Sequence, residues 1–401
     1  MEPVTHMLTG ACLSRTGLNR KAAYATLTMV VAAEFPDVDM LWGLRGPVDQ
    51  FQHHRGITHA FLGLPFEAAF IVAGVYGWHR WRVARRTRAD AAAGSRFPSG
   101  ASGAVIRPLT AAPVRWGVLY GLALLALLSH LLLDYTNNYG LRPFFPFNDQ
   151  WYAASIVFLF DPVIFALLLG ALTTPWLFGL VGSEVGARKQ PFRARGWAIA
   201  ALLGVVGWWA LREVEYGRAV QLAMTQNIPA PMKTVASPGP DPIDQEGVAP
   251  AEATPTYLVA QKALASPDLL SPFQWSAVTD FGPVYQLSEI DTQSGTLMPG
   301  DTTYPKPGDS PAVRTAEDSK LGRAYMDWSP MPFVEVVKAD SELADGTGRG
   351  GDGVEKVVTF RDPRFMGGWM GTPARSALSG TVSLNAAGKI VQETMDGRVE
   401  R

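Results

Sequence analysis

The sequence predicts an α-helical integral membrane domain, with about four spans and an N-terminal helical hairpin, followed by a small β-rich soluble domain. Long apolar runs lie almost entirely before residue 211, and the remainder is rich in Pro, Gly, Asp, Ser and Thr. Crossing a bilayer takes roughly 20 mostly apolar residues. We therefore divide the 401 residues into a membrane domain (1–215), a Pro-rich linker (216–256) and a β-rich domain (257–401).

The apolar runs set the elements of the membrane domain. Two short stretches, about Val4–Arg15 and Ala22–Phe35, predict a helical hairpin that is buried, re-entrant or interfacial. Four longer stretches predict the spans. Asp-Pro at 161–162 is a typical start for the third span, and the fourth is the shortest. The predicted spans are Ala60–Trp78, Val114–Leu133, Pro162–Gly182 and Trp197–Leu211.

Basic residues predict the orientation of these spans. Seven arginines lie between residues 80 and 107, and four Lys or Arg residues lie in 188–195, whereas 135–161 contains only Arg142. Because basic loops stay in the cytoplasm, the 135–161 loop is expected to be external. We expect a multi-pass membrane protein, in contact with the lipid bilayer.

This topology brings polar residues together. The first span begins beside His59, and the second ends beside His130 and Asp134, so all three lie at the external end. The hairpin has a basic turn, and its open ends carry His6 and Asp37. Four separate segments are therefore expected to converge on one face of the bilayer.

The spacing of these residues supports a shared site. His130 and Asp134 are four residues apart, so they project from one helix face. Asp37 and Asp39 are two apart and, in an extended segment, would point the same way. Gly56 permits a sharp turn that could bring the histidines on either side of it together.

Structural roles are the alternative for each residue taken alone. His130 could hydrogen-bond a neighbouring backbone group, Asp37 and Asp39 could cap a helix, and Thr58 could cap the first span. Arg55 could be a surface residue or could bind an anionic group through paired hydrogen bonds. Joint convergence favours a metal site, because burying these groups unpaired would be costly.

Imidazoles and carboxylates are ligands for zinc, manganese or iron. We predict one or two divalent transition ions, with zinc preferred. The predicted ligands are His6, Asp37, Asp39, His54, His59, His130 and Asp134.

Four motifs carry a family resemblance. They are T-H-x-x-x-G at His6, P-D-V-D at residues 36–39, H-R-G-I-T-H at 54–59 and S-H-L-L-L-D at 129–134. With them, residues 1–215 resemble the membrane-bound, metal-dependent hydrolases of the YdjM-like family, also described as LexA-regulated inner-membrane hydrolases. Many members carry Ser where this chain has Ala60, and His where it has Met40.

The metal site and the resemblance together predict a metal-dependent hydrolase at the bilayer surface. Asp39 and Arg55 are the predicted catalytic residues, and the expected substrate is lipid-like, such as a phosphoester or ester. The alternative is a non-catalytic membrane protein with a structural or sensory metal site and an interaction domain. A transporter is disfavoured because the ligands lie at one face rather than at the midplane. The oligomeric state is left open.

The sequence that follows the membrane domain predicts a linker and then several β-strands. A Pro-rich segment, about Thr225–Thr256, has the composition of an extended linker. Residues 385–388 (Asn-Ala-Ala-Gly) are typical of a hairpin turn. The β-rich domain is expected on the external side, with the metal site. With one cysteine and no basic surface of the nucleic-acid type, neither a disulfide framework nor a nucleic-acid partner is expected. The predicted strands are Trp275–Asp280, Val284–Ile290, Pro332–Lys338, Val354–Phe360, Gly380–Leu384 and Lys389–Thr394.

Overall fold

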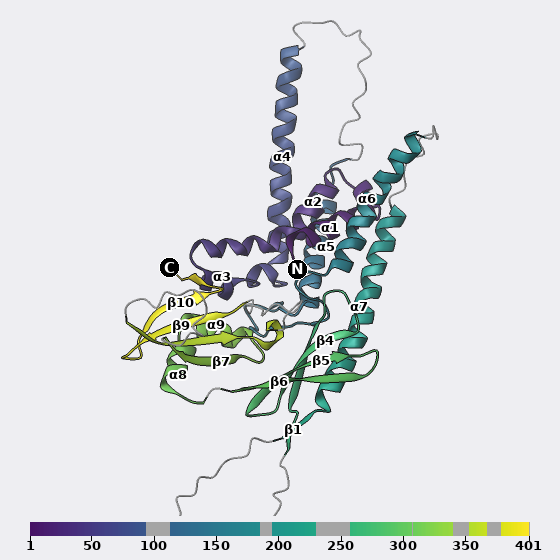
Figure 1. Cartoon of the computed structure of the whole chain (residues 1–401). Coiled ribbons are helices and arrows are strands. Elements are labelled where there is room, and N and C mark those ends of the chain that lie inside the picture. Colours follow the sequence, from purple (N-terminus) through teal and green to yellow (C-terminus); the bar gives the residue numbers. More distant parts are fainter. Residues whose placement is uncertain are drawn as a thin grey trace, which may run out of the picture.

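The computed structural model describes residues 1–93, 113–184, 195–229, 257–306, 308–339, 353–366 and 378–400. Figure 1 shows the helices of the first half in one region and the strands of the second half in another. Helix α7 (Arg195–Met224) reaches from the first region to the second. A helical N-terminal region followed by a β-rich C-terminal region is therefore confirmed.

The N-terminal hairpin consists of α1 (Pro3–Arg15) and α2 (Ala25–Glu34), joined through the 3₁₀ turn η1 (Leu18–Arg20). Both predicted helices are confirmed within a few residues. The two helices pack closely at Gly10, where a Cβ atom would lie 2.6 Å from the carbonyl oxygen of Met29. A larger residue at this position would force the hairpin apart.

Three short helices follow the hairpin: η2 (Phe35–Leu44), α3 (Pro47–His53) and η3 (Ile57–His59). The prediction of an extended segment at Asp37 and Asp39 is wrong, because η2 is a 3₁₀ helix. With three residues per turn, side chains two positions apart point roughly 120° apart. The two carboxylates therefore face different partners.

The longer helices are α4 (Leu64–Ala93), α5 (Trp116–Thr136), α6 (Pro162–Glu184) and α7. Over the described residues, only α5 and α7 are each long and apolar enough to cross a membrane. A third candidate is the pair Pro47–His59 and Leu64–Arg85, which is bent by 85°. Four spans are therefore not confirmed.

Two of the predicted spans differ from the structure for physical reasons. The chain turns at residues 60–63, so α4 begins at Leu64 rather than Ala60, and its second half carries arginines. Thr58 does not cap this helix, because its hydroxyl donates to Asp39 instead. In α6 the described apolar stretch is Pro162–Pro175, which is shorter than a membrane span. The predicted cap of α6 is confirmed, since Asp161 Oδ1 accepts hydrogen bonds from the amides of Val163 and Ile164.

Two antiparallel sheets and a short pair of strands form the C-terminal region. All six predicted strands are present, and the predicted turn is confirmed by Asn385 Oδ1, which accepts from the amides of Ala387 and Lys389. The four-stranded sheet has the order β3-β4-β5-β6, the five-stranded sheet β11-β10-β9-β8-β7, and β1 pairs with β2. The strands are β1 (Asn227–Pro229), β2 (Tyr257–Val259), β3 (Lys262–Pro267), β4 (Gln274–Asp280), β5 (Val284–Asp291), β6 (Thr296–Pro305), β7 (Phe333–Lys338), β8 (Val354–Arg361), β9 (Gly380–Asn385), β10 (Ile390–Met395) and β11 (Arg398–Val399).

The sequence did not predict β1, β2, β3, β6 and β11, or the helices α8 (Pro311–Glu317) and α9 (Lys320–Trp328). Strand β6 contains Pro299 and Gly300, residues that are depleted in strands, and it lies at the edge of its sheet, where Pro is tolerated. The predicted linker also begins too early: α7 is helical through Met224 and β1 follows it. Residues 230–256 of the linker lie outside the described residues.

The β-rich region packs directly on the short helices that precede the first long helix. Val48 and Phe51 of α3 share a core with Tyr325 and Trp328 of α9. The indole of Trp328 also donates to the carbonyl of Tyr139, 3.1 Å away. The five-stranded sheet and its helices therefore lie on the segments that follow η2 and α5.

Candidate metal centre

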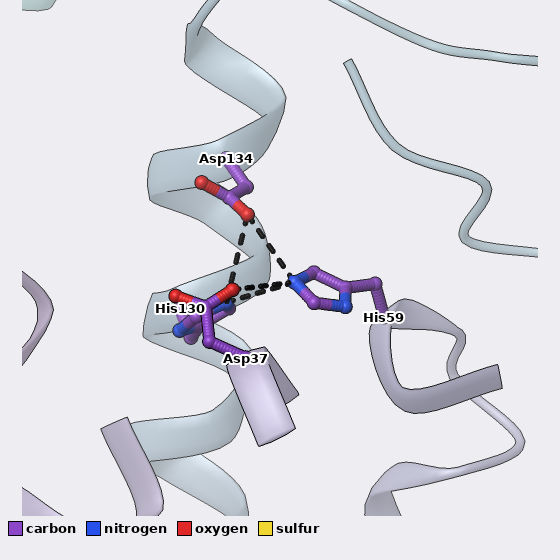
Figure 2. Close-up of side chains that lie close together, drawn as sticks. All are labelled: Asp37, His59, His130 and Asp134. Carbon is purple, nitrogen blue, oxygen red and sulfur yellow. Dashed lines mark hydrogen bonds and ion pairs between the residues drawn. The ribbon is translucent and has the colours of Figure 1, made fainter. Parts of the chain in front are cut away.

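Four side chains from three elements, three of them fully buried, meet at one point (Figure 2). They are Asp37 from η2, His59 from η3, and His130 with Asp134 from α5. The Nε2 atom of His59 lies 3.0 Å from Nε2 of His130 and 3.4 Å from one carboxylate oxygen of each aspartate. The Nε2 atom of His130 lies 3.5 Å from Asp134 and 3.7 Å from Asp37. The four-residue spacing of His130 and Asp134 thus places both on one helix face, as expected.

These separations fit a metal ion. Zinc bound at about 2.0–2.2 Å by a tetrahedron of nitrogen and oxygen donors separates the donors by about 3.3–3.6 Å. The five donor–donor separations given above, 3.0–3.7 Å, bracket that range. Within the described residues, Asp134 Oδ2 has no hydrogen-bond partner, although the side chain is fully buried. Burying a carboxylate oxygen without a partner costs free energy, and a cation at the centre would supply the missing partner.

In both imidazoles, the contact made by Nδ1 orients the ring so that Nε2 faces the cluster. His130 Nδ1 lies 2.7 Å from the carbonyl oxygen of Ala33 and can only donate to it, which leaves Nε2 as the free acceptor. His59 Nδ1 lies 3.2 Å from Asp39 Oδ2, and its Nε2 faces the cluster. Such outer partners fix the ring and the protonated nitrogen of a metal-binding histidine. Sequence reasoning missed the Ala33 carbonyl, because backbone atoms leave no mark in a motif.

Asp39 organises the loop that follows it. Its Oδ1 atom lies 3.0 Å from His54 Nδ1, and Oδ2 accepts from the amide of Arg55 and the hydroxyl of Thr58. Burial alone would raise the pKa of Asp39, but the hydrogen bonds from His54 and His59 outweigh it and hold the pKa below its ordinary value. The carboxylate is therefore charged.

A second group of possible ligands overlaps the first. Asp37, Asp39 and His54 each offer one ligand atom, and these atoms lie within 4.8 Å of one another. Asp37 belongs to both groups. The geometry thus has a place for a carboxylate shared by two ions, in addition to the single-ion cluster.

We expect Asp39→Asn to weaken metal binding about 10–100-fold without abolishing it, because the outer partner of His59 loses its charge. A competition titration of the purified chain against a zinc chelator measures the affinity. Asp49→Asn is the matched control, since Asp49 pairs with Lys320 and belongs to neither group of ligands. Loss of a whole ion per chain, rather than of affinity, would show instead that Asp39 is itself a ligand.

Arg55, a predicted catalytic residue, is 3% exposed and has a left-handed backbone at φ 56°. Its Nη2 atom lies 2.9 Å from Asp134 Oδ1, and Nη1 donates to the carbonyl of Gly140 and to Asn137 Oδ1. The guanidinium also lies over the ring of Tyr139. In this arrangement Arg55 holds Asp134 and the turn after α5.

His6 borders the cluster without joining the four. Its ring stacks on His130, with centroids 3.8 Å apart, and its Nε2 lies 3.5 Å from Asp134 Oδ1. Burial lowers the pKa of His6 to about 3, so the ring is neutral at pH 7. Neither ring nitrogen has a hydrogen-bond partner among the described residues. His53 and His79 lie apart, the first stacked on Trp42 and the second against the hydroxyl of Tyr24.

Glu34 is a residue that sequence reasoning missed. It ends α2 and lines a cavity together with Asp37. Burial, helped by the charge of Asp37, raises its pKa to about 8, so the carboxyl is mostly protonated at pH 7. Its Oε2 atom has no partner among the described residues. The available signal was a carboxylate in the last turn of an apolar helix, three residues before Asp37.

Two comparisons with known proteins find similarity over about half of the chain. A family model described as "YdjM inner membrane protein" matches residues 1–218. The uncharacterized protein YfhP of Bacillus subtilis (strain 168) is 25% identical over 187 residues, which are 45% of this chain and 47% of that protein. The chain thus spans about half the length of this relative. No solved structure matches the chain.

Proposed function

The chain belongs to the YdjM inner membrane protein family, and from this premise we propose that it is a membrane-bound, metal-dependent hydrolase acting at the bilayer surface. The observation that carries the proposal is the cluster of two imidazoles and two carboxylates, in which each Nε2 atom lies 3.0–3.7 Å from the other donor atoms. The substrate would be a lipid, or another phosphoester or ester.

His59, His130, Asp37 and Asp134 would hold a divalent transition ion, with zinc favoured by the nitrogen and oxygen donors and their spacing. When bound, such an ion polarises the scissile bond and lowers the pKa of water toward ~7. Asp39 and the Ala33 carbonyl keep the two rings turned toward the centre. Glu34, which lines the same cavity as Asp37, would deliver a proton to the leaving group and regain one from water.

The proposal is tested with the purified full-length chain in lipid nanodiscs. Metal content is measured, and ester, phosphoester and amide lipids are then offered with and without a chelator. We expect hydrolysis of at least one lipid class that stops on chelation and returns when zinc, manganese or iron is added back. A metal-loaded chain that hydrolyses none of the three classes would refute the enzyme reading.

A structural or sensory metal site is the second candidate, and one observation favours it. Four protein donors saturate a tetrahedral ion, as in structural zinc sites, whereas catalytic sites keep a position open. A catalytic site would require either that one of the four donors leaves the ion or that the ion accepts a fifth ligand. Asp37 suits this role, because its side chain is 11% exposed and those of the other three are fully buried. X-ray absorption of the metal-loaded chain distinguishes the two, since a bound water ligand supports catalysis.

The proposed location is the inner membrane, crossed by α4, α5, α6 and α7, with the metal centre and the β-rich region outside. Arginine-rich segments at one end of α4 and before α7 support this orientation. In a Cys12→Ser background, we expect Asp149→Cys to react with a membrane-impermeant maleimide in right-side-out vesicles. Arg88→Cys should react only after permeabilisation. The reverse labelling pattern would place the metal centre in the cytoplasm.

A further inference from the structure

An apolar cavity opens beside the metal centre. Its volume is about 440 Å³, within the range of small-molecule sites. It lies between α1, α2 and η2, and apart from Glu34 and Asp37, which carry carboxyl groups, the residues that line it are apolar. The apolar lining residues are Met7, Val30, Val31, Phe35, Val38 and Met40.

This groove reaches the metal centre through Asp37. The side chains of His59, His130 and Asp134 are fully buried, whereas that of Asp37 is 11% exposed and lines the groove. Of the four donors, Asp37 is therefore the one that a molecule from outside meets first. Glu34 lines the same groove, with a buried oxygen that has no partner in the described part of the chain.

The outer rim of the groove is apolar and exposed. Val31, Val38 and Met40 are 41%, 42% and 50% exposed. In a membrane domain such a surface suits lipid rather than water, and a contiguous apolar patch marks a binding site. Neither Lys nor Arg is among the residues that line the groove.

We propose that this groove holds one acyl chain of a membrane glycerophospholipid and brings the ester or phosphoester linkage of that lipid to Asp37. The inference rests on the proposed function, because it names the substrate class of the same site. The chain occupies the apolar lining, while the polar linkage lies between the metal centre and Glu34. Lipid would enter sideways from the bilayer, without first passing through water.

The test fills the groove with a bulky side chain. Val31→Trp and Val38→Trp are compared with Leu203→Trp, a control at a position on α7 that is 66% exposed and does not line the groove. Each full-length protein is placed in nanodiscs containing phosphatidylethanolamine with a photoreactive diazirine in one acyl chain. Three quantities are measured: crosslinks located by mass spectrometry, metal content, and hydrolysis of long-chain and short-chain substrates.

We expect crosslinks at the lining residues in the parent and control proteins, reduced at least about fivefold in the two groove variants, with unchanged metal content. Hydrolysis of the long-chain lipid should fall about tenfold or more in the groove variants, while that of a soluble short-chain ester or phosphoester changes little, because only the long chain uses the groove.

The outcomes separate the two proposals. Crosslinks in the groove without any hydrolysis would keep the lipid groove and refute the hydrolase. Hydrolysis that survives both substitutions, or crosslinks no denser in the groove than around Leu203, would refute the groove and leave the hydrolase standing. If a variant loses its metal, it is misfolded, and the crosslink positions in the parent protein decide the question.

Discussion

Replacing His59 or His130 with alanine is expected to strip the chain of its metal. Each imidazole contributes one of four converging donors. Without it, only three donors would remain, and a cavity would replace the lost ring in a buried site. We expect the metal content to fall from about one ion to below about 0.1 ion per chain. Hydrolysis should fall by more than the 10–100-fold typical of losing an outer partner. Mass spectrometry of the metal and the lipid assay measure both effects.

His79→Ala is the matched control, because His79 lies on α4 away from the cluster and contacts Tyr24. It should keep both metal and activity. All variants should still insert into the membrane, since the apolar helices are unchanged. Metal retained at full stoichiometry in both His59→Ala and His130→Ala would refute the site.

Arg55→Ala is expected to lower the free energy of unfolding by about 1.5–3 kcal/mol, since it removes a charged hydrogen-bond partner of a buried carboxylate. That carboxylate belongs to Asp134, which is fully buried, lies 2.9 Å from the guanidinium and keeps the amino group of Met1 and the side chain of Asn137 as partners. The substitution also frees the carbonyl of Gly140 and the side chain of Asn137. Denaturant titration of the purified chain in detergent measures the change.

Arg45→Ala serves as the control for this substitution. Arg45 is exposed and lies over the ring of Trp42, so its loss should cost about 0.5 kcal/mol or less. A bound cation stabilises Asp134 as well, so the loss caused by Arg55→Ala should be smaller with zinc present. A loss no larger than that of Arg45→Ala, in the metal-free chain, would contradict a structural role for Arg55.

Several features could be predicted because they depend on local pattern. Alternation and turn residues located the six predicted strands, and the apolar runs located α1, α2 and α5. The motifs supported a family resemblance that the family model confirms over residues 1–218. Strand β6 was missed because tertiary pairing with β5 overrides its unfavourable Pro299 and Gly300.

The roles of individual site residues were less predictable. Asp37 and Asp39 looked alike in the motif, but the 3₁₀ geometry of η2 turns Asp37 toward the two histidines and Asp39 toward the loop at His54. Arg55 looked free to bind an anion, yet it is held by Asp134 and Gly140. Glu34 had no motif of its own and gains its raised pKa from burial and the charge of Asp37.

What the amino-acid order alone determined was the list of chemically capable side chains and the side of each helix on which they lie. Helical periodicity and loop charge are properties of neighbours in the chain, so they can be read without a fold. Only the tertiary structure decided which donors share a centre, because an ångström-scale distance between His59 and His130 depends on packing between segments 71 residues apart. The same packing decided which carboxyl group faces the apolar groove.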